Sequence, residues 1–268
     1  MKNNLIIRYG VEIETATNLL LDSDEKAPYH EWDEDEYYLF AGQWKVEEDG
    51  SLGEHGYIDT AEFILRYPKE KRAFFRALRG WKEGIQRRGF KRLHSAVEFN
   101  KTCGCHIHIS LSFKNGKMLP VDFVKWEHLV AIRKRVLKKI DRELPHIYPF
   151  FVGQYYRNYA QRMESIENGF EERYSEWNLQ TADDEDFHIE WRSFNLMGVK
   201  TWADFFKMFR IAIDTIETVF RGEMQKEHPF LVREERKITP PNPILMENHN
   251  VNIDIPTTEQ LIEVEIPI

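Results

Sequence analysis

The chain has 268 residues, of which 42% are hydrophobic and 31% charged, the ordinary composition of a globular protein. A formal net charge of −8 argues against general affinity for nucleic acid. No segment reaches the roughly 20 consecutive apolar residues that a membrane-spanning helix needs, and residues 1–7 are too short and too polar for a signal peptide. Two cysteines, Cys103 and Cys105, are too few for a disulfide framework. We therefore expect a cytoplasmic protein with no membrane contact.

The N-terminal part of the chain predicts two strands separated by a long acidic connection. Residues 5–15 form the first expected strand, and residues 43–48 form a shorter one that ends in the turn signal Asp49-Gly50-Ser51. A connection as long as residues 18–42 is usually a lid or an excursion from the fold. Its density of acidic side chains favours a solvated loop: Asp22, Asp24, Glu25, Glu31, Asp33, Glu34, Asp35 and Glu36.

The middle of the chain predicts two strands, each followed by an amphipathic helix. Residues 60–66 form a strand, and Pro68 then stands where a first helical residue often lies. Residues 69–88 are expected to be helical because apolar side chains recur at helical spacing: Phe74, Leu78, Trp81 and Ile85. Residues 103–111 form the next strand. A helix over about residues 122–140 follows, with a similar stripe: Leu129, Ile132, Val136 and Ile140. The basic sides of both helices are typical of solvated surfaces.

The last part predicts a strand pair, one more helix and a tail. Residues 174–179 and 187–194 form the strand pair, and Thr201 with Asp204 begins the helix in the manner of a capping box. We expect a catalytic domain over residues 1–235 and a Pro-rich extended arm over residues 236–268. Because strands and helices do not alternate regularly, an α+β fold is favoured over a doubly wound one.

Four of the expected strands carry polar side chains on one face and apolar side chains on the other. Successive residues of a strand point to opposite faces, so residues of equal parity share a face. If the strands form one sheet, its second face gathers glutamates, histidines and arginines: Glu12, Glu14, Glu62, Arg66, His106, His108, Ser110, His188, Glu190 and Arg192. Each pair alone is more often just the solvated side of a strand. The shared register on all four strands favours an active site.

Four carboxylates on one face require cations, because like charges in proximity raise each other's pKa. Arg66, Arg192 and bound divalent metal ions can supply them. A ligand set of imidazoles and a majority of carboxylates suits Mg²⁺ or Mn²⁺ better than a thiolate-type zinc site. Several metal ions facing phosphate oxygens are the usual arrangement for phosphoryl transfer.

Five motifs in this order resemble those of the amidoligase family, which belongs to the carboxylate–amine ligase superfamily together with glutamine synthetase and glutamate–cysteine ligase. They are Gly10-Val11-Glu12-Ile13-Glu14, Glu48-Asp49-Gly50-Ser51-Leu52, Glu62, Cys103-Gly104-Cys105-His106-Ile107-His108-Ile109 and Glu190-Trp191-Arg192. Residues 174–179 are similar to a further stretch of the family through Asn178. The chain departs from the family after Glu62, where a Ser-Pro is common and Arg66 stands in a different sequence.

The resemblance implies a role for each matching residue. Glu14 and Glu62 would hold a metal ion near the acyl substrate, whereas Glu12, His106 and Glu190 would hold the metal ion that bridges the ATP phosphates. The implied catalytic residues are Arg192 and Glu62, and we expect Arg66 to replace the family's substrate contacts where the chain departs from it. The implied nucleotide-binding residues are His108, Arg192 and Ser51.

The implied fold is a curved antiparallel sheet of the glutamine synthetase catalytic-domain type, with helices on its convex face. The implied activity is ATP-dependent amide bond formation through an acyl phosphate, with ATP and Mg²⁺ or Mn²⁺ as cofactors and small-molecule or peptide carboxylates and amines as substrates. An oligomer is compatible with this interpretation. Two alternatives remain open: a metal-dependent hydrolase that uses His106, His108 and Glu190, and a non-catalytic binding module on the same fold.

Overall fold

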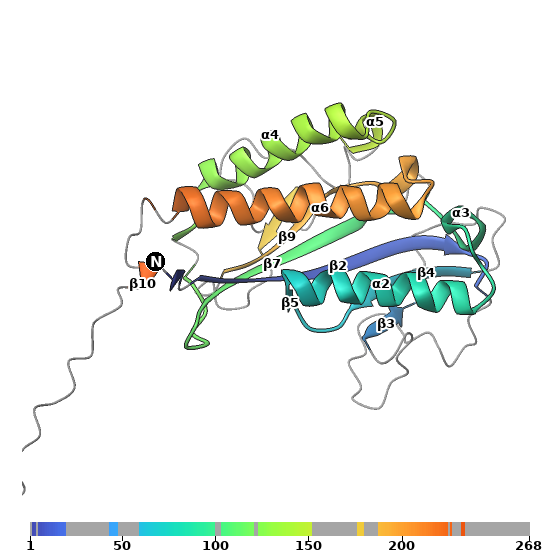
Figure 1. Cartoon of the computed structure of the whole chain (residues 1–268), viewed down its shortest axis with the longest axis horizontal. Helices are drawn as coiled ribbons and strands as arrows, with labels where there is room; N and C mark the ends of the chain where they lie inside the picture. Colours follow the sequence, from blue (N-terminus) through green and yellow to red (C-terminus); the bar gives the residue numbers. More distant parts are fainter. Residues whose placement is uncertain are drawn as a thin grey trace, which may run out of the picture. The chain divides into compact units, whose positions relative to one another are not determined.

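The computed structural model describes residues 2–3, 5–19, 43–47, 59–99, 103–120, 123–151, 176–179, 187–224, 226 and 232–233 (Figure 1). Residues Met1–Glu234 form one compact unit and residues Glu235–Ile268 form another. The second unit, which contains the expected Pro-rich arm, lies outside the described residues, as does the acidic segment 20–42.

One antiparallel sheet organises the described residues. Its strands lie in the order β3 (Trp44–Glu47), β4 (Asp59–Leu65), β2 (Leu5–Thr17), β7 (Cys105–Phe113), β9 (His188–Phe194) and β8 (Trp177–Leu179). Two short strands, β5 (Lys69–Glu70) and β6 (Val97–Glu98), also pair with β2. Strands β1 (Lys2–Asn3) and β10 (Val232–Arg233) form a separate two-stranded sheet. Strands β2 and β7 therefore lie at the centre of the main sheet.

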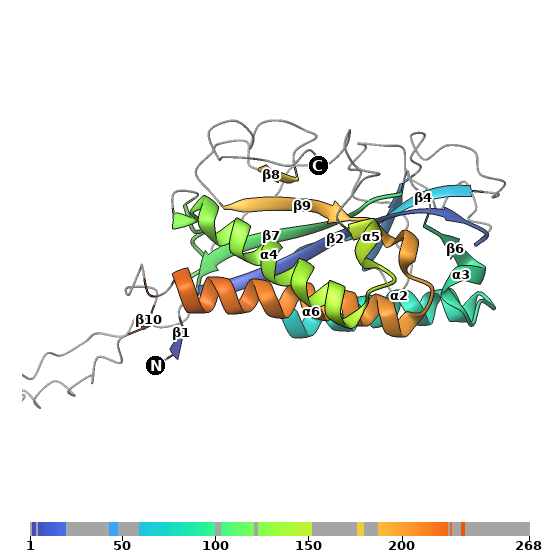
Figure 2. The ribbon, with the colours of Figure 1, turned by 90° about the horizontal axis from the view of Figure 1, so that it is seen from above.

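Three long helices cover one face of the main sheet: α2 (Lys71–Arg87), α4 (Trp126–Glu143) and α6 (Trp202–Val219) (Figures 1 and 2). The shorter helical segments are α3 (Leu93–Ala96), α5 (Tyr148–Phe151), η5 (Leu196–Gly198) and η6 (Phe220–Met224). Among the described helices, none combines the length and apolar character that a bilayer crossing requires.

The apolar face of the strands packs under these helices. On β2 the ring of Tyr9 lies 5.8 Å from that of Phe74 on α2, and its hydroxyl donates a hydrogen bond of 3.1 Å to Glu217 on α6. On β4 the ring of Phe63 lies 5.5 Å from that of Trp81, also on α2. Burial of such aromatic side chains is the main source of stability in a core of this kind. The polar residues of the same strands therefore lie on the opposite face.

The expected α+β class, with a curved antiparallel sheet and helices on one face, is confirmed. The expected pairing of β8 with β9 and the capping of α6 are also confirmed, because Thr201 Oγ1 accepts a hydrogen bond from the Asp204 amide at 3.1 Å. Cys103 and Cys105 are both buried thiols, and the Cys103 thiol donates to the Glu98 carbonyl at 3.8 Å.

Several expected boundaries were wrong. Helix α2 begins at Lys71 instead of residue 69 because Lys69 and Glu70 pair with β2, so Pro68 is not its first residue. Helix α4 runs from Trp126 to Glu143, whereas residues 122–140 were predicted.

Candidate active site

The polar side chains of neighbouring strands lie directly opposite one another in the register of the sheet. Glu14 of β2 is paired with Glu62 of β4, and Glu12 of β2 with His106 of β7. His108 of β7 is paired with Glu190 of β9. Opposite residues in an antiparallel sheet have Cβ atoms about 4.5–5.5 Å apart. The register therefore brings residues that are far apart in the sequence into one cluster on the face opposite the helices.

The imidazole of His106 lies among three carboxylates. Its Nδ1 is 2.8 Å from Glu190 Oε1 and 3.1 Å from Glu12 Oε2, and its Nε2 is 3.6 Å from Glu14 Oε1. Burial alone would lower the pKa of His106, but the charges of Glu190 and Glu14 and the hydrogen bond to Glu12 raise it well above the ordinary value. The surrounding carboxylates therefore favour the protonated form of His106.

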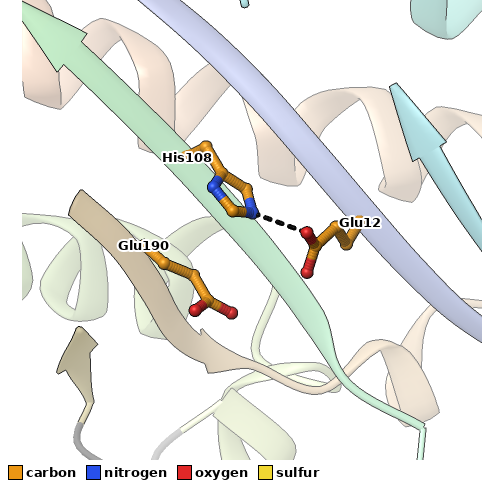
Figure 3. Close-up of side chains that lie close together, drawn as sticks. All are labelled: Glu12, His108 and Glu190. Atoms are coloured by element: carbon orange, nitrogen blue, oxygen red, sulfur yellow. Dashed lines mark ion pairs between the residues drawn. The ribbon is translucent and has the colours of Figure 1, made fainter. Parts of the chain in front are cut away.

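His108 bridges Glu12 and a second imidazole. Its Nε2 lies 3.0 Å from Glu12 Oε1, as Figure 3 shows, and its Nδ1 lies 3.2 Å from His188 Nε2. Burial, together with the positive charge of His108, lowers the pKa of His188 to about 4. The neutral His188 ring can therefore accept a hydrogen bond from the Nδ1–H of His108. Burial opposes the cationic form of His108 as well, but Glu12 raises its pKa above the ordinary value.

Glu190 is the most enclosed carboxylate of the cluster, with 1% of its surface exposed. Arg192 Nε donates to its Oε1 at 2.8 Å, and Asn178 Nδ2 on β8 donates to its Oε2 at 3.2 Å. Burial would raise the pKa of Glu190, but the charge and hydrogen bond of His106 together with the charge of His108 outweigh it and lower this pKa to about 2. For the same kind of reason, with His108 as the main cation, the pKa of Glu12 lies well below its ordinary value.

Two groups of side chains have the geometry of metal ligands. Potential ligand atoms of Glu12, His108 and Glu190 all lie within 4.8 Å of one another, and so do those of Glu12, Glu62 and His106. Figure 3 shows the first group, with one side chain from each of β2, β7 and β9. Glu12 belongs to both groups and is placed to bridge two ions. Carboxylate and imidazole donors in this proportion fit Mg²⁺ or Mn²⁺.

This arrangement differs in part from the one that the motif resemblance implies. The described structure groups His108 with Glu12 and Glu190, where the resemblance places His106. Glu14 belongs to neither group, and one of its oxygens accepts a hydrogen bond from the Gly104 amide. Each imidazole is instead paired directly with a carboxylate, His106 with Glu190 and Glu12, and His108 with Glu12.

The roles of two expected site residues stay predictions. Arg66 follows β4, and its guanidinium lies 4.9 Å from the centre of the Tyr67 ring. Ser51, with the neighbouring Asp49, lies outside the described residues, so its nucleotide-binding role stays a prediction.

The sequence interpretation missed a buried ion pair beside the cluster. Lys45 Nζ lies 2.7 Å from Glu47 Oε1, and both residues are buried on strand β3. Glu47 is paired with Glu62, so three carboxylates (Glu47, Glu62 and Glu14) lie in a row across three strands. The signal was present in residues 44–47, where Lys45 and Glu47 alternate with Trp44 and Val46. A lysine on an edge strand is usually exposed to solvent, so the pattern offered no reason to expect a buried ion pair at Lys45.

Comparison with known proteins gives structural likenesses only. No family model matches the sequence, and no curated protein matches it. Among solved structures, the chain is similar to a novel glutamine synthase homolog, with 14% identity and a TM-score of 0.42 over 85% of this chain and 62% of that chain. It is similar to Plasmodium falciparum glutamine synthetase, with 13% identity and a TM-score of 0.34 over 80% and 52% of the two chains. It is also similar to GmaS without ligand, with 14% identity and a TM-score of 0.29 over 81% and 55%.

The chain thus spans between 52% and 62% of the length of these structures. Identities of 13–14% and TM-scores below 0.5 are too low to transfer an activity. The chemistry of the site has to be argued from its own residues.

Proposed function

We propose that the chain is an ATP-dependent carboxylate–amine ligase whose active site is the polar face of the sheet. One observation carries this proposal: four neighbouring strands, β4, β2, β7 and β9, have a register that gathers polar side chains into two overlapping ligand groups, with Arg192 alongside. The groups contain Glu12, Glu62, His106, His108 and Glu190. The order of the motifs along the sequence supports the same conclusion. A triphosphate next to so many carboxylates requires divalent metal ions between them.

The two ligand groups are the proposed metal sites. Glu12, His108 and Glu190 would hold one ion, and Glu12, Glu62 and His106 would hold the other. When bound, Mg²⁺ or Mn²⁺ supplies positive charge to the oxygens of the transferred phosphoryl group. Glu14 borders the second group through its contact with His106, and we assign it to the support of that group.

The proposed reaction has two steps. An oxygen of the acid substrate attacks the γ-phosphorus of ATP, the bond to the β-phosphate oxygen breaks, and ADP leaves an acyl phosphate behind. The amine nitrogen then attacks the acyl carbon, and inorganic phosphate leaves as the amide forms. The nitrogen loses its extra proton to a carboxylate of this face, for which Glu62 is the candidate. No covalent enzyme intermediate is needed.

Arg192 is proposed to stabilise the transferred phosphoryl group. Its Nε donates to Glu190 at 2.8 Å, which fixes the guanidinium beside a proposed metal ligand. A planar guanidinium can donate two parallel hydrogen bonds to two phosphoryl oxygens at once, a geometry that a lysine ammonium lacks. Such contacts strengthen as charge moves onto the oxygens and so act mainly on the transition state.

The hydrolase alternative receives less support. It requires His106, His108 and Glu190 to ligate a single ion, but within the described residues the two histidines fall in different ligand groups. His108 also has its Nδ1 directed to His188, which leaves Nε2 as its available ligand atom.

The experiment is a measurement of ADP release from ATP and Mg²⁺ with mixed pools of carboxylic acids and amines. We expect ADP formation that depends on both pools. Arg192→Lys should lower kcat by about 10²-fold or more while the affinity for ATP changes much less. Arg79→Lys is the matched control, because Arg79 is exposed on the outer side of α2. Wild-type turnover in Arg192→Lys, or ADP release that depends on neither the acid pool nor the amine pool, would contradict the proposal.

A further inference from the structure

Two glycines lie against the histidines of the site, and the backbone conformation of neither one requires glycine. Gly104 directly precedes β7, and Gly10 is in the middle of β2. Among the described glycines, the positive φ angles that favour this residue occur at Gly89 and Gly116. The backbone at Gly10 and Gly104 is therefore open to any residue, and the reason for glycine has to be the space that a side chain would take.

At Gly104 the missing side chain leaves room for a carboxylate and an imidazole together. A Cβ atom there would lie 2.7 Å from His106 Nε2 and 3.0 Å from Glu14 Oε2. The same residue holds Glu14 through its backbone, since its N–H donates to Glu14 Oε2 and its carbonyl accepts from the Glu14 N–H at 3.1 Å. Glu14 and His106 are thus placed against bare backbone.

At Gly10 the same relation holds in a milder form. Gly10 is paired with His108 across β2 and β7, and a Cβ atom there would lie 3.1 Å from His108 Cβ and 3.6 Å from its Cγ. This contact is tight, and the nearest atom is a Cβ held by the backbone of β7. The 2.7 Å contact at Gly104 cannot be relieved without moving a side-chain end.

We propose that Gly104 is a positioning residue of this site: its missing Cβ allows Glu14 and His106 to approach each other, and Gly10 does the same, more weakly, for His108. The contacts at Gly104 are with the ends of side chains, so a methyl group displaces those ends and leaves the sheet intact. The other nitrogen of His106, Nδ1, contacts Glu12 and Glu190, so a displacement of the ring also breaks these contacts.

The consequence for metal binding rests on the proposed function. Residues that orient metal ligands without touching the ion typically change affinity by about 10–100-fold when they are altered. Gly104→Ala should therefore weaken Mn²⁺ binding, measured on the full chain without nucleotide, by about that factor. Gly10→Ala should weaken it by less. Gly80→Ala is the control, because a Cβ at Gly80 meets nothing within 4 Å.

A second measurement needs no metal. Imidazole resonances of the chain in EDTA, assigned by their loss in His106→Asn, should shift for His106 in Gly104→Ala, whereas the exposed His94 and His146 stay unchanged. The chain should stay folded in EDTA, with a melting temperature that falls less than in Glu190→Gln, because the methyl group displaces contacts of His106 but removes no charge. An unchanged His106 resonance, or a Gly104→Ala chain that fails to fold, would overturn the proposal, since the role of the glycine would then be absent or purely structural.

The two measurements also separate this inference from the proposed function. If the wild type binds Mn²⁺ and Gly104→Ala binds it equally well, the positioning role is wrong and the metal site stands. If the wild type binds no Mn²⁺ at all, the metal site is wrong. The imidazole resonances then still decide whether Gly104 places His106.

Discussion

The two faces of the central sheet are built from the same strands but differ in what they bury: one face buries apolar side chains and the other buries charged ones. On β2, Tyr9, Val11 and Ile13 are almost fully buried under the helices, whereas Glu12 and Glu14 between them lie in the cluster of carboxylates and histidines. The apolar face gains stability from burial. The polar face buries charges, which costs desolvation free energy and is often no more stable than an apolar replacement. Burying so much charge brings the fold no evident gain in stability, and this supports a functional use of the polar face.

The apolar face has an aromatic hub, and breaking it should have the largest effect. The ring of Trp81 lies between 5.3 and 5.9 Å from those of Trp44, Phe63, Trp202 and Phe205. We expect Trp81→Ala to lower the free energy of unfolding by about 3–5 kcal/mol, because the cavity adds to the lost burial. Urea denaturation measures it. A loss below about 1 kcal/mol would show that the hub is not the core of the fold.

On the polar face a single substitution should cost less stability and more activity. In Glu190→Gln the partners His106 and Arg192 lose the charge that they contact at 2.8 Å. We expect the metal-free protein to lose about 1–3 kcal/mol of unfolding free energy, the range for hydrogen bonds to charged groups. ADP formation should fall to background. Full activity in this variant would exclude Glu190 from the site.

The two kinds of charge on the polar face predict a stability maximum in mildly acidic solution. The pKa of Glu190 falls from 4.5 to about 2 on folding, so its contribution is present above pH 4.5 and is lost as the pH falls towards 2. The pKa of His106 rises well above 6.5, so its contribution is complete below pH 6.5 and is lost as the pH rises through the folded value. Melting temperatures in EDTA between pH 3 and 9 measure both limbs.

Adding Mg²⁺ should change the alkaline limb alone. A metal ion competes with the proton for the imidazole, so the rise in melting temperature caused by Mg²⁺ should grow with pH. His106→Asn is the matched variant, in which the alkaline loss in EDTA should become shallower. A Mg²⁺ effect that is independent of pH would contradict ligation by His106.

The outer surface of the helices should show the smallest effect. Arg79 is exposed on α2, and α2 packs on the face of the sheet opposite the cluster of carboxylates and histidines (Figure 2). We expect Arg79→Ala to change the free energy of unfolding by less than about 0.5 kcal/mol and to leave ADP formation unchanged. A large loss of activity would indicate a second functional surface on the helices.

Alternation along the strands was sufficient to predict the faces of the sheet, and the order of strands and helices along the chain predicted the fold class. The period of two in Glu12 and Glu14, and in His106 and His108, is a local property that the sequence displays directly. The helical stripe that contains Trp81 is equally local. Boundaries were less predictable, because Lys69 and Glu70 are drawn into pairing with β2 by a tertiary contact.

The grouping of the ligands could not be predicted in the same way. It depends on the register between strands, which places Glu12 opposite His106 and His108 opposite Glu190. Register is set by the whole sheet, and a shift of one residue would move every side chain to the other face. The pairing of Lys45 with Glu47 was missed because burial of an edge strand depends on the segments that cover it.

The central claim, a metal-dependent nucleotide site on the polar face, is tested most directly by calorimetric titration of ATP into the chain with Mg²⁺ and in EDTA. Glu12, which belongs to both ligand groups, provides the matched variant Glu12→Gln. We predict measurable ATP binding by the wild type in Mg²⁺, very weak binding in EDTA, and weakened binding by Glu12→Gln in Mg²⁺. Equal affinity of the wild type for ATP in Mg²⁺ and in EDTA would contradict the claim.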